Sequence, residues 1–141
     1  LMDEKKLLRG QYGGYLNEQN VKNESKTETF FRAILGINNK RWKGVPFELE
    51  SGKALNKNEI FIEICFKKMK ACLRFTISSA QSKSYDAYEK VFSDCFSGDQ
   101  TIFVSTKEIM AEWKLVTDII KLWQKKPLVI YSKGVKPEDI K

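Results

Sequence analysis

The chain contains no histidine. Histidine is the side chain that most often serves as a general base near neutral pH, so its absence excludes Ser-His and Cys-His nucleophilic pairs. The sequence also lacks the G-x-G-x-x-G and Walker patterns that hold nucleotide phosphates on a glycine-rich loop. The chain therefore carries no recognisable catalytic residues of its own.

Cysteine is scarce, with residues only at Cys65, Cys72 and Cys95. An odd number without paired short spacing argues against a disulfide framework, and the cytoplasm is the simplest compartment for such a chain. The C-x-x-C spacing typical of zinc sites is absent, so we expect no metal site. No apolar run approaches the ~20 residues that span a bilayer, and the first residues lack a signal-peptide pattern, so we expect no membrane association.

Positive charge is in excess, with a net charge of +7. This excess favours an anionic partner, which ranges from a nucleic acid to a phosphorylated metabolite. The lysines are scattered, and only residues 67–70 and 125–126 form short clusters. Because no basic stripe with interleaved aromatic side chains is present, nucleic acid is not the expected partner.

The chain has 141 residues, of which 42% are hydrophobic and 30% charged, as expected for a globular protein that forms a single domain with a sizeable core. Alternating apolar residues predict strands at 27–37, 47–50, 59–66 and 71–77, and the last two are close enough to form a hairpin. Strands followed by helices predict an α+β domain, with helices packed on one face of a mainly antiparallel sheet. We expect a lead-in and loop over 1–26, the sheet over 27–79, helices over 84–126 and an irregular tail over 127–141.

Two helices are predicted, one over 86–97 and a longer one from 105 to the residues before Pro127. Asp86 with Glu89, and Ser105 with Glu108, have the spacing of capping boxes. Each helix has an apolar stripe that we expect to be buried, formed by Tyr88, Val91, Phe92, Cys95 and Phe96 in the first and by Ile109, Trp113, Val116, Ile120 and Trp123 in the second.

One stretch stands out around the second predicted strand. Residues 41–47 read RWKGVPF and residues 51–55 read SGKAL, and Gly52 permits either a positive φ or a close backbone approach just before Lys53. With RGQY at 9–12, SKTETF at 25–30, DAYEK at 86–90 and GDQTIFV at 98–104, these segments resemble, in order, the C-terminal domain of glucose-6-phosphate dehydrogenase.

This resemblance implies a protein that oxidises glucose 6-phosphate at C1 to the lactone with NADP. The nucleotide-binding loop and the catalytic histidine would belong to a preceding N-terminal domain, which would be the partner of this chain. The chain would then form the substrate side of the site and carry subunit contacts, with a homodimer formed through its sheet. A stretch that supplies further strands between residues 74–76 and Asp86 is missing here, so the sheet should be smaller than in the family.

The resemblance also implies four substrate-binding positions. Lys53 matches the lysine that contacts the sugar phosphate in the family, where an ammonium offers one charge and three donors. Asn58 stands where the family often has a second basic residue, with Lys57 one position earlier. Thr76 stands where the family often has a glutamine near the substrate. Read from the residues alone, without the resemblance, Lys53 is better explained as an exposed loop lysine.

Some family members hold an additional structural NADP on this domain through basic residues. Their counterparts here are Glu50, Glu59, Glu63 and Arg74, of which three are acidic and would repel the phosphates. We therefore expect no NADP on this chain itself, and we expect Arg74 to pair with Glu59 or Glu63 across adjacent strands.

Two other functions remain open from the sequence. The shortened sheet and the loss of charge at Asn58 fit a non-catalytic binding or assembly module derived from the same domain. The net charge alone fits a generic anion-binding or nucleic-acid-binding domain.

Overall fold

A computed structural model of the chain describes residues 2–77 and 87–141. The chain divides into two compact units. One comprises Leu1–Lys57 together with Lys114–Lys141, and the other comprises Asn58–Trp113. The sequence predicted a single domain over the whole chain, and this remains a prediction.

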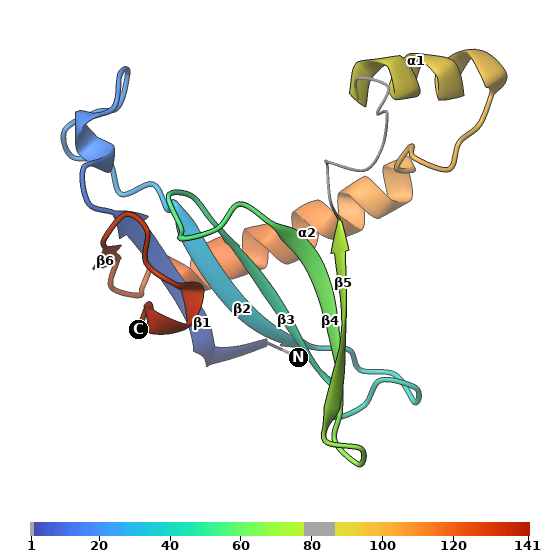
Figure 1. The fold of residues 1–141 in the computed structure, drawn as a ribbon, viewed down its shortest axis with the longest axis horizontal. Helices are drawn as coiled ribbons and strands as arrows, with labels where there is room; N and C mark the ends of the chain where they lie inside the picture. The colour runs from blue at the N-terminus through green and yellow to red at the C-terminus, as the bar shows by residue number, and fades with distance from the viewer. Residues whose placement is uncertain (1, 78–86) are drawn as a thin grey trace. The chain divides into compact units, whose positions relative to one another are not determined.

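The first unit is built on a four-stranded sheet in the order β3-β2-β1-β6 (Figure 1). Its strands are β1 (Met2–Tyr12), β2 (Phe30–Gly36), β3 (Pro46–Gly52) and β6 (Val129–Tyr131). β1 pairs with β2, and β2 with β3, in antiparallel fashion, whereas β6 lies parallel to β1. The first two strands predicted from alternation are thereby confirmed within a few residues.

Two expectations for the ends of the chain were wrong. Residues 1–26 were expected to be a lead-in, but β1 lies in the middle of the sheet, and the expected irregular tail contains β6. The sequence did not predict β1 because two of its buried positions are polar, which breaks the alternation of apolar residues. These are Arg9 and Gln11, which are 7% and 3% exposed. Each is satisfied locally, since Arg9 pairs with Glu28 at 2.7 Å and the Gln11 amide donates to the carbonyl of Thr27 at 3.0 Å.

The two faces of this sheet are covered by different segments. On one face, buried Leu7 and Ala33 pack against Ile119 of α2 (Thr106–Trp123), and four partly buried side chains extend this cluster: Phe31, Leu35, Leu122 and Trp123. Phe31, Ala33 and Leu35 share one face of their strand, as the alternation predicted.

The opposite face carries a second buried cluster, formed by Tyr12, Phe30, Tyr131 and Ile140. Phe30 is 1% exposed and Ile140 is 2% exposed. Ile140 follows a short 3-10 helix, Pro137–Asp139, so the segment after β6 returns to complete this core.

The second unit contains an antiparallel hairpin and a helix. Strands β4 (Ile60–Phe66) and β5 (Ala71–Ile77) pair with each other, as predicted, and α1 spans Ala87–Ser97. Cys65 and Cys72 are direct register partners in the hairpin and form a disulfide. The sequence argument against a disulfide was therefore wrong, because it judged spacing along the chain and not the register across strands.

The predicted helices are present, but the burial expected for their stripes was wrong. In α1 the exposed fractions of Phe92 and Phe96 are 60% and 90%, and in α2 Trp113 is 63% exposed. Periodicity identifies an apolar face and does not say which partner covers it. The Ser105–Glu108 capping box is confirmed by reciprocal hydrogen bonds of 2.8 and 3.3 Å, whereas Asp86 lies outside the described residues.

Taken together, the chain has mixed α and β content with mostly antiparallel pairing, as the α+β prediction required. Among the described helices, none combines the length and the apolar character that a bilayer crossing demands.

Candidate functional site

Lys53 directly follows the last residue of β3, and its backbone is fixed on both sides. Its N–H donates to the carbonyl oxygen of Thr29 at 2.8 Å, and its own carbonyl accepts from the Tyr131 hydroxyl at 2.8 Å. The Lys53 side chain itself is exposed. A fixed backbone with a free ammonium limits the volume that the charge explores, which lowers the entropic cost of binding an anion.

Tyr131 is the centre of this anchor. It is 5% exposed, and its hydroxyl lies 3.0 Å from the hydroxyl of Thr29, whose oxygen also accepts from the backbone N–H of Tyr12 at 2.9 Å. A hydroxyl group has one hydrogen, so Tyr131 accepts from Thr29 when it donates to Lys53. The site is thus tied to β1, to the start of β2 and to β6 at once.

The turn after Lys53 is clamped by the segment that follows β6. Ala54 adopts a left-handed conformation with φ +54°, and its carbonyl accepts from the N–H of Gly134 at 2.8 Å. The N–H of Asn56 donates to the carbonyl of Val135 at 3.0 Å, next to a bridge between Leu55 and Val135. These contacts hold a strained non-glycine residue in place.

Gly52 is required for close packing. A Cβ atom at this position would lie 2.7 Å from Cδ2 of Phe30 and 2.8 Å from Cδ1 of Leu55. Of the two roles that the sequence left open for Gly52, close approach is the one the structure uses. The absence of a side chain at Gly52 lets the backbone of β3 pack directly on the Phe30 ring. The next residue, Lys53, is exposed.

A shallow pocket of about 160 Å³ lies beside the lysine and is lined by Glu28, Thr29, Phe30, Phe31, Ser51, Gly52 and Lys53. The carboxylate of Glu28 is paired with Arg9, so it opposes an incoming anion less than a free carboxylate would. Among residues 2–77 and 87–141, no carboxylate pairs with the Lys53 ammonium. A larger hollow of about 840 Å³ is lined by eight residues between positions 15 and 27, of which only Lys22 is basic, and it lacks the anchored cation of the Lys53 pocket.

The other predicted substrate residues are distributed over both units. Lys57 is exposed and belongs to the same unit as Lys53, whereas Asn58 and Thr76 belong to the second unit. Thr76 is exposed on β5, opposite Phe61 of β4. The structure therefore brings Lys53 together with Ser51 and the Thr29 region, and the substrate-binding roles of all four residues stay predictions.

Two of the three acidic positions, Glu50 and Glu59, are engaged in ion pairs. Glu50 lies 2.7 Å from the guanidinium of Arg32, and Glu59 lies 3.0 Å from that of Arg74. The expected cross-strand pair of Arg74 is thus confirmed with Glu59 as the partner. The Arg74 guanidinium also stacks on the Phe61 ring at 3.7 Å from its centroid.

Comparison with known proteins identifies the family. The model of the glucose-6-phosphate dehydrogenase C-terminal domain matches residues 2–80 and 70–140. The chain belongs to the glucose-6-phosphate dehydrogenase family. The matched region includes Lys53 and the residues that line the pocket beside it.

Relatives of known function agree with this assignment. Glucose-6-phosphate 1-dehydrogenase of Chlamydia pneumoniae is 31% identical over 174 residues, covering 83% of this chain and 34% of the relative. A cytoplasmic isoform of Arabidopsis thaliana is 32% identical and covers 85% of this chain and 31% of the relative. The chain thus spans about a third of the length of these glucose-6-phosphate dehydrogenases.

Solved structures of glucose-6-phosphate dehydrogenases share the fold. The Mycobacterium avium enzyme superposes with a TM-score of 0.70 at 22% identity, covering 95% of this chain and 37% of that chain. A glucose-6-phosphate dehydrogenase in complex with glucose 6-phosphate gives a TM-score of 0.71 at 25% identity, covering 98% of this chain and 39% of that chain.

The alignment with the Chlamydia pneumoniae enzyme runs over 174 residues and is longer than the 141-residue chain. The relative therefore carries residues that this chain lacks. The family model also matches in two pieces that meet near residues 70–80. The alignment length supports the expectation of a missing stretch, and the split of the family match supports its place shortly after β5.

Sequence reasoning missed the residues that hold the site in place. Tyr131, Thr29 and Val135 make the contacts around Lys53, and none was singled out. The only local signal was the short run at 128–131, which reads LVIY and is typical of a strand.

We expect the Tyr131→Phe variant to lose less stability than the wild type when the pH is raised into the alkaline range. Burial raises the pKa of the Tyr131 hydroxyl above its ordinary value of 10.0, against the lowering effect of its hydrogen bonds. The unfolded chain therefore releases this proton first, and stability falls as the pH rises above about 10. Urea unfolding from pH 8 to 11 should show a shallower decline in the variant, on top of a cost of about 1–3 kcal/mol for the unpaired Lys53 carbonyl.

Some decline should remain in Tyr131→Phe, because burial also raises the pKa of Tyr12. An unchanged slope in the variant would contradict the assigned role of Tyr131. Retention of full stability at pH 8 would show that its hydroxyl does not hold the Lys53 turn.

Proposed function

We propose that this chain forms the substrate side and an assembly surface of a glucose-6-phosphate dehydrogenase, which oxidises glucose 6-phosphate to the 6-phosphogluconolactone with NADP. This is the entry reaction of the pentose phosphate pathway, and the cytoplasm is its proposed location, as in the cytoplasmic plant relatives. The observation that carries the proposal is the position of Lys53. Its backbone is anchored beside a pocket, its ammonium is exposed, and both the residue and the pocket lie in the segment that matches the family.

In this mechanism the residues of the chain bind and orient glucose 6-phosphate, and they do not transfer hydride or protons. Lys53 neutralises charge on the phosphate and donates hydrogen bonds to its oxygens, and Asn58 adds an uncharged contact, with Lys57 beside it in the sequence. An N-terminal nucleotide-binding domain, the partner of this chain, would hold NADP as the acceptor for the hydride of C1 and would supply the base for the hydroxyl proton. The proposed contribution of Thr76, near the substrate, follows from the resemblance alone.

The test is a titration of the chain with glucose 6-phosphate, followed through the backbone amide signals of residues 51–54. We expect saturable shifts there, and we expect Lys53→Ala to weaken binding about tenfold or more, since hydrogen bonds to charged groups contribute about 1.5–3 kcal/mol. Lys43→Ala removes a lysine from the exposed turn at the opposite end of β3 and serves as the matched control, with wild-type affinity. Glucose without the phosphate should produce no shift at these residues.

Equal affinity in Lys53→Ala and wild type would remove Lys53 from the site. Absence of any shift with glucose 6-phosphate would favour the alternative of a non-catalytic binding or assembly module derived from the same domain.

We also propose that the chain holds no structural NADP of its own. Glu50, Glu59 and Glu63 occupy the positions where basic residues would meet the phosphates, and the first two are already paired with arginines. A calorimetric titration with NADP should show no binding at micromolar concentrations of the chain. Tight binding of NADP would contradict this.

The hairpin supplies the proposed homodimer contact. One face of β4 and β5 is entirely apolar and largely exposed, formed by Ile60, Ile62, Ile64, Phe66, Leu73 and Phe75. An uncharged face of this kind fits the same face of a second copy about a two-fold axis. Sedimentation equilibrium should show a dimer that Ile62→Glu dissociates and Thr76→Glu, on the reverse face, leaves intact. A monomeric wild-type chain would exclude this contact.

A further inference from the structure

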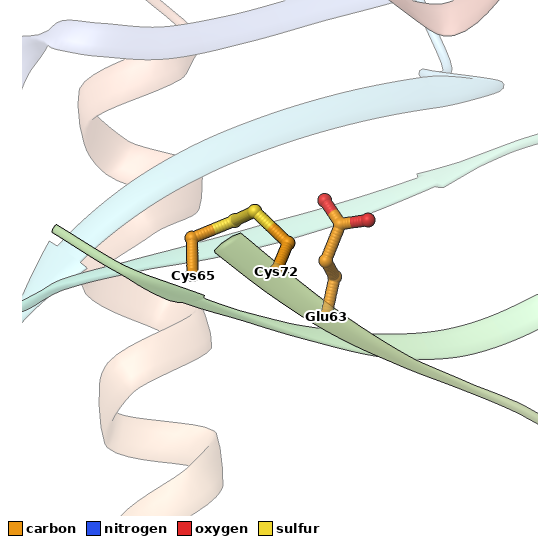
Figure 2. A group of neighbouring side chains, drawn as sticks. All are labelled: Glu63, Cys65 and Cys72. Carbon is orange, nitrogen blue, oxygen red and sulfur yellow. A yellow bond between two sulfur atoms is a disulfide. The ribbon is translucent and has the colours of Figure 1, made fainter. Parts of the chain in front are cut away.

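Three potential metal ligands meet on the reverse face of the hairpin. Glu63, Cys65 and Cys72 place their ligand atoms within 4.8 Å of one another, and all three side chains are exposed (Figure 2). Cys65 and Cys72 are direct register partners across β4 and β5, with Cα atoms 4.1 Å apart. The hairpin register therefore creates a cluster that the spacing of the cysteines along the chain does not reveal.

The carboxylate of Glu63 is available for a ligand. Its register partner Arg74 is directed to Glu59 at 3.0 Å and to the Phe61 ring. Within residues 2–77 and 87–141, Glu63 itself has no hydrogen-bond or ion-pair partner. An acidic side chain beside two sulfur atoms, with the nearest arginine committed elsewhere, is suited to a cation.

The disulfide is open to reduction. It is exposed and joins residues only 7 positions apart, so it removes little conformational freedom from the unfolded chain. A dithiol reductant, of the kind that keeps cytoplasmic thiols reduced, transfers two electrons and two protons and is itself oxidised to a disulfide. The ladder of β4 and β5 keeps Cys65 and Cys72 opposite each other after the bond has opened.

We propose that the reduced pair binds a thiophilic divalent cation such as Zn²⁺, with Cys65, Cys72 and Glu63 as ligands. Thiolates select such metals, and tetrahedral coordination with zinc–sulfur distances of 2.3 Å needs sulfurs about 3.8 Å apart, which side-chain rotation allows across this pair. Binding displaces one proton from each thiol, and water completes the coordination. Because the two cysteines are already held together, little ordering is required.

The experiment uses the full chain, reduced with a dithiol and freed of it without air, and Co²⁺ as a spectroscopic probe. We expect thiolate-to-cobalt charge-transfer absorption that saturates at one ion per chain, is bleached by Zn²⁺ and is accompanied by release of two protons. The oxidised chain of identical sequence should show no such absorption. Cys65→Ser and Cys72→Ser should each abolish the saturable signal, and Glu63→Gln should weaken affinity at least tenfold.

Two matched controls isolate the site. Cys95→Ser removes the third, free cysteine, and Glu59→Gln removes the neighbouring carboxylate that is already paired with Arg74; both should retain wild-type affinity. The proposal is overturned if the reduced wild-type chain gives no charge-transfer band, or if Cys95→Ser abolishes it. It is equally overturned if Glu63→Gln binds Co²⁺ as tightly as wild type, because the site would then lack its third ligand.

Discussion

Phe30→Ala should lower the free energy of unfolding by about 3–5 kcal/mol, the cost of emptying a fully buried aromatic position. Phe30 is 1% exposed, its ring lies 5.8 Å from that of Tyr131, and β3 approaches it closely at Gly52. These neighbours are backbone and buried side chains that cannot collapse into the gap. Since small domains are stable by only about 5–15 kcal/mol, the variant should be near the limit of folding.

Denaturant unfolding measured by circular dichroism gives the change directly. Phe96→Ala is the matched control, because it deletes the same atoms from a side chain that is 90% exposed, and it should shift stability by less than about 0.5 kcal/mol. Equal effects of the two substitutions would mean that the buried cluster around Phe30 does not stabilise the fold as described.

Ile140→Ala should cost about 2–5 kcal/mol although the residue is next to the last in the chain. Ile140 is 2% exposed and packs in the same cluster as Phe30 and Tyr131. Loss of its side chain should also loosen the segment at Gly134 and Val135 that clamps the turn after Lys53. We therefore expect faster amide hydrogen exchange at Asn56, whose N–H donates to the Val135 carbonyl.

Ile130→Ala is the corresponding control, since Ile130 lies in β6 but is 64% exposed. Its effect on stability should be within about 0.5 kcal/mol, and exchange at Asn56 should not change. If Ile140→Ala proves as mild as Ile130→Ala, the last residues of the chain have no role in holding the Lys53 site.

The sequence predicted those elements whose pattern is local. Strict alternation located β4 and β5 to within one residue, and helical periodicity with the Ser105 cap located both helices. Lys53 was identified through a motif, and its position at the end of a strand followed from the same residues. In each case the information lies within about ten consecutive positions.

What the sequence did not reveal depends on pairing between distant residues. Arg9 and Gln11 read as surface residues because their partners, such as Glu28 and the Thr27 carbonyl, are known only from the fold. Tyr131 was missed for the same reason, since it reaches Lys53 across 78 positions. Predicting the Cys65–Cys72 disulfide requires the exact register of the hairpin. The alternation of apolar residues alone does not determine that register.

The parallel pairing of β6 with β1 has a consequence for synthesis of the protein. Gly10 pairs with Val129, so the edge of β1 that binds β6 stays unpaired until residue 129 has been synthesised. Pairings of such large sequence separation slow folding, and a nascent chain in this condition offers its open strand to other chains. Rapid translation as far as β6, or a chaperone that shields β1 during that interval, would therefore raise the fraction of the protein that reaches its native state.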